Sequence, residues 1–109
     1  MFGNLFSKPY TDLGAVEFKK MLEGTPNVVL LDVRTAAEVA QGAIKGNRNI
    51  DIMSGNFNNK IDGLDKDKIY LIYCRSGARS ANACRVMASK GFKNLYNLSG
   101  GYMAYPKGK

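Results

Sequence analysis

Two short apolar runs constrain the fold of this chain more than any other feature of its sequence. Residues 28–33 read VVLLDV, and residues 69–73 read IYLIY. Runs of this length, rich in β-branched and aromatic side chains, are typical of strands buried on both faces of a parallel sheet. A segment with helical features follows each run. The alternation of strands and helices therefore predicts an α/β fold, with a small parallel sheet covered by helices on both faces.

The segments around these runs predict the remaining elements. Thr35 and Glu38 form a capping-box pattern, which predicts a helix directly after the first strand. Apolar residues at three- and four-residue spacings from Ala81 to Ala88 predict a second helix, which Gly91 ends. Weaker patterns predict helices over residues 14–23 and 57–61, and short strands over residues 47–52 and 94–98.

The chain has 109 residues, which is the length of one domain. We expect residues 1–9 to be an N-terminal lead-in, residues 10–105 to form the domain, and residues 106–109 to be a short tail. We also expect the domain to act as a monomer.

Histidine is absent from the chain, and its absence excludes several kinds of site. No Ser–His or Cys–His catalytic pair can form without it. The two cysteines, Cys74 and Cys84, cannot build a tetrahedral zinc site by themselves, so we expect no metal.

The net charge of +7 is spread along the sequence, with Lys19-Lys20 as its one basic doublet. Because no basic run is interleaved with aromatic residues, we expect no nucleic-acid partner, and a positive field that attracts small anions instead. No apolar run approaches the ~18 residues that span a bilayer, so we expect no membrane association. Residues 1–8 lack the features of a signal peptide, which favours a cytoplasmic protein with reduced cysteines.

Cys74 begins the segment CRSGAR, between the second buried strand and a helix. Open α/β sheets bind ligands at the C-terminal ends of their strands. Gly77 permits a backbone in which successive N–H groups point inward, and the helix start adds further free N–H groups. Arg75 and Arg79 add positive charge. We therefore predict an anion-binding loop around a thiol whose pKa lies below that of free cysteine.

The other candidate residues are interpreted as structural. Cys84 lies on the apolar stripe of the following helix, which favours core packing. A carboxylate at Asp32 or Glu38 could be catalytic, but a free carboxylate beside a thiolate would raise the pKa of the thiol. We therefore expect Asp32 to fix the loop backbone and Arg34 to pair with Glu38, four residues on. A buried structural role is the alternative for Cys74 itself.

Four motifs occur in a characteristic order along the chain. They are LDVR at residues 31–34 followed by Glu38, Gly42 with Ile44 and Asn49-Ile50, YCRSGARS at residues 73–80, and LSGG at residues 98–101. Together they resemble the single-domain rhodaneses, a family of sulfurtransferases, over about residues 10–105. The resemblance implies a rhodanese-like three-layer fold, with a small, mostly parallel sheet of four to five strands and helices on both faces.

The sequence departs from the family pattern at two positions. Ala43 stands where histidine is common, and Asn47 stands where alanine is common. Both positions are usually structural in the family, so we expect altered packing there and little loss of chemistry.

The resemblance also implies a mechanism and its partners. The Cys74 thiolate would take the sulfane sulfur of a small anionic donor such as thiosulfate and carry it as a persulfide, with no cofactor other than this covalent sulfur. The acceptor would be cyanide in an assay, and a thiol or a thioredoxin-like protein in the cell. We expect Arg75 to bind the anionic end of the donor and Arg79 to brace the loop, with donor binding as its second possibility. The substrate-binding residues would be Arg75, Ser76, Gly77, Ala78 and Arg79.

Other functions within the same fold remain open at this point. Four residues separate Cys74 from Arg79, whereas related phosphatases have five, and this favours sulfur over phosphate. The two arginines also differ from the pattern of family members that use mercaptopyruvate, so thiosulfate or a persulfide is the expected donor. The alternative to an enzyme is a non-enzymatic sulfur carrier or a regulatory or binding module of the same family.

Overall fold

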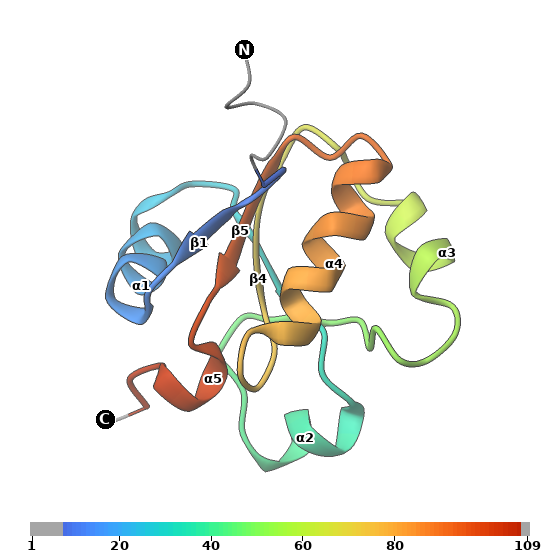
Figure 1. The fold of residues 1–109 in the computed structure, drawn as a ribbon. Coiled ribbons are helices and arrows are strands. Elements are labelled where there is room, and N and C mark those ends of the chain that lie inside the picture. The colour runs from blue at the N-terminus through green and yellow to red at the C-terminus, as the bar shows by residue number, and fades with distance from the viewer. Residues whose placement is uncertain (1–7, 108–109) are drawn as a thin grey trace.

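The computed structural model describes residues 8–107, which form a sheet of five strands with helices around it (Figure 1). The strand order is β1-β5-β4-β2-β3, and every neighbouring pair is parallel. β4 is therefore the central strand. The strands are β1 (Thr11–Leu13), β2 (Val29–Asp32), β3 (Arg48–Asn49), β4 (Ile69–Tyr73) and β5 (Asn94–Leu98). The helices are α1 (Ala15–Gly24), α2 (Ala36–Gln41), α3 (Phe57–Asp62), α4 (Ala78–Ser89) and α5 (Gly101–Ala104).

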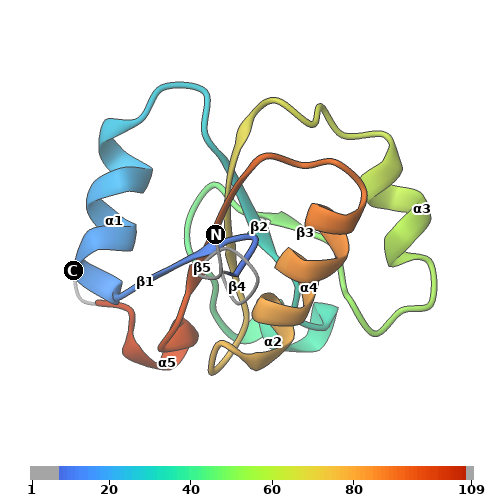
Figure 2. The same cartoon turned by 45° about the horizontal axis from the view of Figure 1, so that its top comes forward.

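Helices cover both faces of the sheet, with α1 and α5 on one side and α3 and α4 on the other (Figure 2). Side chains of β4 alternate between the two cores that result. Leu71 belongs to the core that includes Phe18 of α1, whereas Ile72 belongs to the core that includes Ile61 of α3 and Met87 of α4. The three-layer α/β architecture predicted from the sequence is confirmed.

Most predicted elements lie close to their expected positions. The two apolar runs form β2 and β4, and the capping box at Thr35 and Glu38 is complete in both directions. Gly91, with φ of 98°, follows α4, and the N–H of Phe92 donates to the carbonyl of Met87 at 3.1 Å, as the predicted cap requires. The strand expected over residues 47–52 is reduced to the two residues of β3.

Two elements were not predicted. β1 is a three-residue edge strand that exists through its pairing with β5, and α5 is a single turn of four residues. The predicted lead-in over residues 1–9 lies mostly outside the described residues. Tyr10, the first residue of the predicted domain, is buried in the core on the α4 side.

Three strands end together at one edge of the sheet and position the site. Because β2, β4 and β5 are parallel neighbours or next neighbours, their C-terminal ends lie side by side. The segments that follow these ends begin at Val33, Cys74 and Ser99. This places the Cys74 loop between two other loops, as the rule for open α/β sheets predicts.

Two kinds of feature are missing from the described part of the chain. No helix between residues 8 and 107 is long and apolar enough to cross a bilayer. The same residues contain no cluster of three or more His, Cys, Asp or Glu side chains that could hold a metal ion.

Candidate active site

Cys74 lies at the base of a tight loop between β4 and α4. The loop runs from Cys74 to Gly77, and α4 begins at Ala78. Gly77 has φ of 106°, which allows the chain to turn so that its N–H group points back at the sulfur. The Cys74 side chain is 1% exposed, whereas Arg75 and Ser76 are exposed.

Hydrogen bonds to the Cys74 sulfur favour its ionised form. The Gly77 N–H donates to Sγ at 3.1 Å, and the Ser80 hydroxyl lies 3.4 Å from Sγ. Burial raises the pKa of the Cys74 thiol, but hydrogen bonds from the Ser80 hydroxyl and from the N–H groups of Ser80, Gly77 and Ser76 outweigh it and lower the pKa. The predicted anion-binding loop is thus present in the geometry, and its N–H groups and Ser80 supply the effect.

The turn after β5 contacts the Cys74 loop through backbone hydrogen bonds. The N–H groups of Tyr102 and Met103 donate to the carbonyls of Cys74 and Arg75, at 2.8 and 3.1 Å. A Cβ atom added to Gly101 would lie 2.1 Å from the Arg75 carbonyl oxygen. No side chain fits at this contact, because real Cβ atoms never approach backbone oxygen so closely.

Gly77 also lies too close to the backbone of the turn after β5 to carry a side chain. A Cβ atom on Gly77 would lie 2.2 Å from the Ser99 carbonyl oxygen. The backbone of the LSGG motif at residues 98–101 therefore packs directly against the Cys74 loop.

Arg79 pairs with Glu38 across the site. Its guanidinium nitrogens Nη1 and Nη2 donate to Oε1 and Oε2 of Glu38 at 2.8 and 2.9 Å, so the pair is bidentate. The hydrogen bond from Arg79 lowers the pKa of Glu38 to about 2, against an opposing effect of burial, and the Thr35 N–H adds to the lowering. Glu38 thus caps α2 and ties it to the first turn of α4.

The predicted pairing of Arg34 with Glu38 is wrong. Arg34 instead pairs with Asp32, with its NH2 group 2.7 Å from Oδ2, and both side chains are buried. Arg34 precedes the extended N-cap Thr35, so the four-residue spacing does not place its side chain on a helix face beside Glu38. The expected role of Asp32 is confirmed, because its Oδ1 accepts the backbone N–H of Arg34 at 3.0 Å.

Arg34 also contacts Gly42 and Tyr102, outside this ion pair. Its NH2 group also donates to the Gly42 carbonyl at 2.8 Å, and its guanidinium carbon lies 4.6 Å from the centroid of the Tyr102 ring. The Asp32–Arg34 pair therefore supports the loops that surround the site, in agreement with a structural role.

Arg75 is placed differently from Arg79, at the open side of the loop. Its Nε lies 3.4 Å from the sulfur of Met103, and its side chain lines a pocket of about 260 Å³ together with Tyr102, Met103 and Lys107. No carboxylate among residues 8–107 pairs with Arg75, whereas Glu38 engages both terminal nitrogens of Arg79. Ala78, the first residue of α4, is also exposed.

Cys84 lies in the core and not in the site. It is fully buried, and this burial raises its pKa to about 12. The interpretation of Cys84 as a core residue is confirmed.

Sequence reasoning missed three residues that contribute to the site. Ser80, one turn into α4, is fully buried and contacts the Cys74 sulfur, and it could have been found from its place in the first turn after the loop. Tyr102 and Met103 act through their backbone N–H groups, which any residue would offer, so no side-chain pattern reveals them.

The chain has relatives along most of its length. A family model described as "Rhodanese-like domain" matches residues 14–107. The protein YtwF of Bacillus subtilis (strain 168) is 38% identical over 94 residues, which are 86% of this chain and 88% of that protein. A protein of Allochromatium vinosum is 33% identical over 96 residues, 88% of each chain. Both relatives are named as sulfurtransferases.

Similar domains also occur in solved structures and in larger proteins. A rhodanese-like domain protein from Staphylococcus aureus has a TM-score of 0.79 and 28% identity, covering 89% of this chain and 92% of that one. The tRNA uridine(34) hydroxylase of Bdellovibrio bacteriovorus is 32% identical over 99 residues, but the match spans only 28% of that protein. The matched motifs, the Cys74 loop and these relatives show that the chain belongs to the family of rhodanese-like domains.

Proposed function

We propose that this protein is a sulfurtransferase that moves a sulfane sulfur from thiosulfate or a persulfide donor to a thiophilic acceptor through a persulfide on Cys74. The observation that supports the proposal most strongly is the environment of the Cys74 sulfur. A buried thiol with a lowered pKa, facing the N–H of Gly77 and the hydroxyl of Ser80, is suited to nucleophilic attack without a histidine.

In the first half-reaction the Cys74 thiolate attacks the outer sulfur of thiosulfate. A bond forms between Sγ and that sulfur, the bond from it to the sulfonate sulfur breaks, and sulfite leaves with the electron pair. Arg75 is suited to hold the sulfonate end, because it lies at the open side of the loop and has no carboxylate partner among residues 8–107.

In the second half-reaction an acceptor attacks the outer sulfur of the persulfide. The sulfur–sulfur bond breaks, and its electron pair returns to Sγ as the thiolate. Cyanide would yield thiocyanate, and a thiolate would yield a new persulfide on a small thiol or on a cysteine of a thioredoxin-like acceptor. The N–H groups at Ser76, Gly77 and Ser80 would stabilise the anion in both half-reactions.

The proposal places the protein in a reducing, cytoplasmic setting, where both cysteines stay as thiols. Both are free in the structure, and Cys84 is buried. Acting as a monomer with the persulfide as its only bound group, the domain would need no further cofactor.

The experiment is intact-protein mass spectrometry after incubation with thiosulfate and removal of excess donor. The expected result is a gain of one sulfur atom, which cyanide then removes. Cys74→Ser should gain nothing, and Cys84→Ser should gain one sulfur. A native protein that gains none from thiosulfate but does from an organic persulfide would be a dedicated carrier, and one that gains none from either donor would be a binding module.

A further inference from the structure

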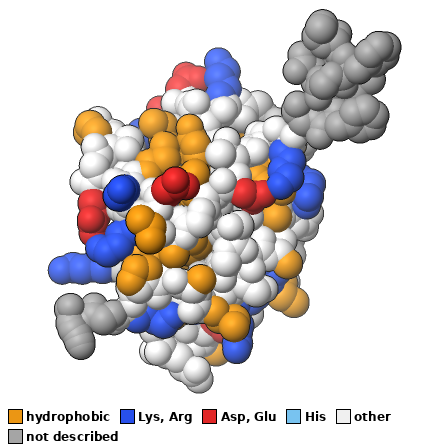
Figure 3. All heavy atoms as spheres, turned by 60° about the vertical axis from the view of Figure 1, so that its left-hand side comes forward, with side chains coloured by type: hydrophobic (Ala, Val, Ile, Leu, Met, Phe, Trp, Pro, Cys, Tyr) orange, Lys and Arg blue, Asp and Glu red, His pale blue; other side chains and the backbone are white. Residues whose placement is uncertain are grey.

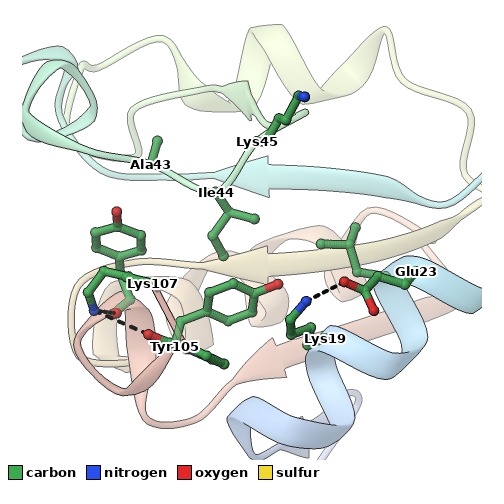
Figure 4. A pocket seen from close by; sticks show the side chains of 10 residues that line it. Lys19, Glu23, Ala43, Ile44, Lys45, Tyr105 and Lys107 are labelled. Carbon is green, nitrogen blue, oxygen red and sulfur yellow. Dashed lines mark hydrogen bonds and ion pairs between the residues drawn. The ribbon is translucent and has the colours of Figure 1, made fainter. Parts of the chain in front are cut away.

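A second pocket, larger than the one beside Arg75, lies between α1, the segment after α2 and the segment after α5 (Figure 4). Its volume is about 570 Å³, which falls in the range of small-molecule sites. None of residues 74–80 lines it. Tyr102 and Lys107 line both pockets, so this pocket adjoins the one that contains Arg75.

The walls of this α1–α5 pocket combine apolar and polar groups in about equal parts. Ile44 points toward the Tyr105 ring across the pocket, and Leu22 of α1 lines the same space (Figure 4). Tyr105 is held by an edge contact with Phe18 of the core, at a centroid distance of 6.2 Å. Ala43 also lines the pocket, but its methyl group points away from Ile44 and Tyr105 (Figure 4). Figure 3 shows apolar side chains gathered on this side of the molecule, with charged groups around them.

Positive charge surrounds the apolar groups of the pocket. Lys19, Lys45 and Lys107 line the pocket, against one acidic side chain, Glu23. Lys19 pairs with Glu23 next to Tyr105, and Lys107 lies on the other side of that ring, where its ammonium donates to the Tyr102 carbonyl at 2.6 Å (Figure 4). Lys45 is exposed and extends away from Tyr105.

An anion entering the pocket would meet a lysine that is only weakly engaged. The Lys19–Glu23 pair joins residues four apart on an exposed helix face, with side chains 41% and 62% exposed. Pairs of this kind are worth little, because water screens both charges. A bound anion could therefore interact with Lys19 while Lys19 stays paired with Glu23. The negative charge of Glu23 would repel that anion and weaken its binding.

We propose that the α1–α5 pocket binds an organic anion with a flat apolar body, of the class of aromatic carboxylates and sulfonates. The apolar body would lie between Ile44 and Tyr105, and its charged group would face Lys19 or Lys107. Thiosulfate would leave most of the volume unfilled. No residue of the Cys74 loop lines this pocket, and the inference does not depend on the proposed sulfur transfer.

The probe for the test is 8-anilinonaphthalene-1-sulfonate, whose fluorescence rises when it enters an apolar pocket. Its uncharged counterpart, N-phenyl-1-naphthylamine, has the same rings without the sulfonate. The expected result is saturable binding of one sulfonate probe per chain. The uncharged probe should bind about tenfold more weakly, the equivalent of one charge-assisted contact.

Matched variants test the location of the site. Glu23→Gln should tighten binding of the sulfonate probe severalfold, and Lys19→Gln should weaken it. Asp67→Asn is the control for Glu23→Gln, since it frees an exposed lysine, Lys93, and raises the net charge equally at a distant ion pair. Asp67→Asn should leave the affinity unchanged. Lys19→Glu, which reverses a charge on the helix surface, should abolish binding of the sulfonate probe.

Three results would overturn the proposal. Equal affinities for the charged and uncharged probes would remove the anion site, and equal effects of Glu23→Gln and Asp67→Asn would reduce it to a general effect of net charge. Unchanged binding by Lys19→Glu would place the probe elsewhere.

Discussion

The sulfur of Cys74 and the sulfur of Cys84 lie in opposite environments within one small domain. Cys74 faces hydrogen-bond donors that lower its pKa, whereas burial is the main cause that raises the pKa of Cys84 to about 12. The pKa values of the two thiols are thus shifted in opposite directions because of their polar surroundings and not their exposure, since both are buried.

The first prediction concerns substitution of each cysteine. Cys74→Ser should abolish thiosulfate:cyanide sulfur transfer and leave the fold intact. Cys84→Ser should keep most of the activity and lose about 1–3 kcal/mol of stability, because a hydroxyl replaces a thiol in an apolar core. Steady-state rates and urea unfolding of both variants check this. Loss of transfer in Cys84→Ser with retention in Cys74→Ser would refute the site assignment.

The second prediction concerns ionisation of Cys74. Its alkylation rate should rise with pH around a midpoint below the ~8.5 of free cysteine, because loop N–H groups and Ser80 stabilise the thiolate. Ser80→Ala should move the midpoint upward, since it removes one donor. A native midpoint at or above that of free cysteine would rule out the hydrogen-bonding account.

At the scale of elements, the loop between β4 and α4 gives its two arginines different surroundings. Arg79 is tied to Glu38 of α2 by two hydrogen bonds, while Arg75 faces the open pocket beside Met103. This contrast agrees with the roles that the sequence resemblance implied for them.

The third prediction separates these roles kinetically. Arg75→Ala should raise the KM for thiosulfate far more than it slows transfer from the loaded persulfide, because a guanidinium bonded to a sulfonate contributes about 1.5–3 kcal/mol. Arg79→Ala should slow both half-reactions, since it releases the loop from α2. Stopped-flow measurement of each half-reaction decides it. Equal losses in both steps for Arg75→Ala would mean that Arg75 also braces the loop.

The strongly patterned elements could be predicted from the sequence, and the weakly patterned ones could not. β2 and β4 are buried on both sides, so their apolar runs identify them. β1 has the sequence TDL, and its three residues become a strand only through pairing with β5, which lies more than eighty positions later. The local pattern of apolar and polar residues does not indicate a pairing partner so far away in the sequence.

The same distinction holds for the candidate site. Cys74, Gly77 and the helix start are adjacent in sequence, so the loop could be predicted from them. The partner of Arg79 is Glu38, forty-one residues away, and only the neighbouring ends of β2 and β4 bring them together. The pairing wrongly expected for Arg34 applied a helical spacing to a residue that precedes its helix.

At the scale of the whole molecule, one ion pair links two helices that are far apart in the sequence and couples stability to pH. The Arg79–Glu38 pair holds α2 against α4, and it lowers the pKa of Glu38 from 4.5 to about 2. Because the folded pKa is the lower one, this stabilisation is complete above pH 4.5. It is lost as the pH falls from 4.5 toward 2.

The fourth prediction follows from this coupling. Glu38→Gln should lower the free energy of unfolding at neutral pH by about 1–2 kcal/mol, since solvent screens a pair that is partly exposed. The variant should also lose less stability than the native protein between pH 4.5 and pH 2. Urea unfolding across this range tests both effects, with Glu17→Gln on the exposed face of α1 as the control. Parallel acid curves for native protein and Glu38→Gln would contradict the coupling.

The backbone contact between the Cys74 loop and the LSGG turn has a consequence for tolerance to mutation. Gly77 and Gly101 both meet carbonyl oxygen where a methyl group would stand, and both have positive φ. In a scan of all single substitutions scored for sulfur transfer, these two positions should reject every alternative, alanine included, with no gradation by size or charge. Gly14 and Gly24, which have open space at the same atom, should accept alanine. The activity of this protein would then be most intolerant at two positions whose side chains contribute nothing to the chemistry.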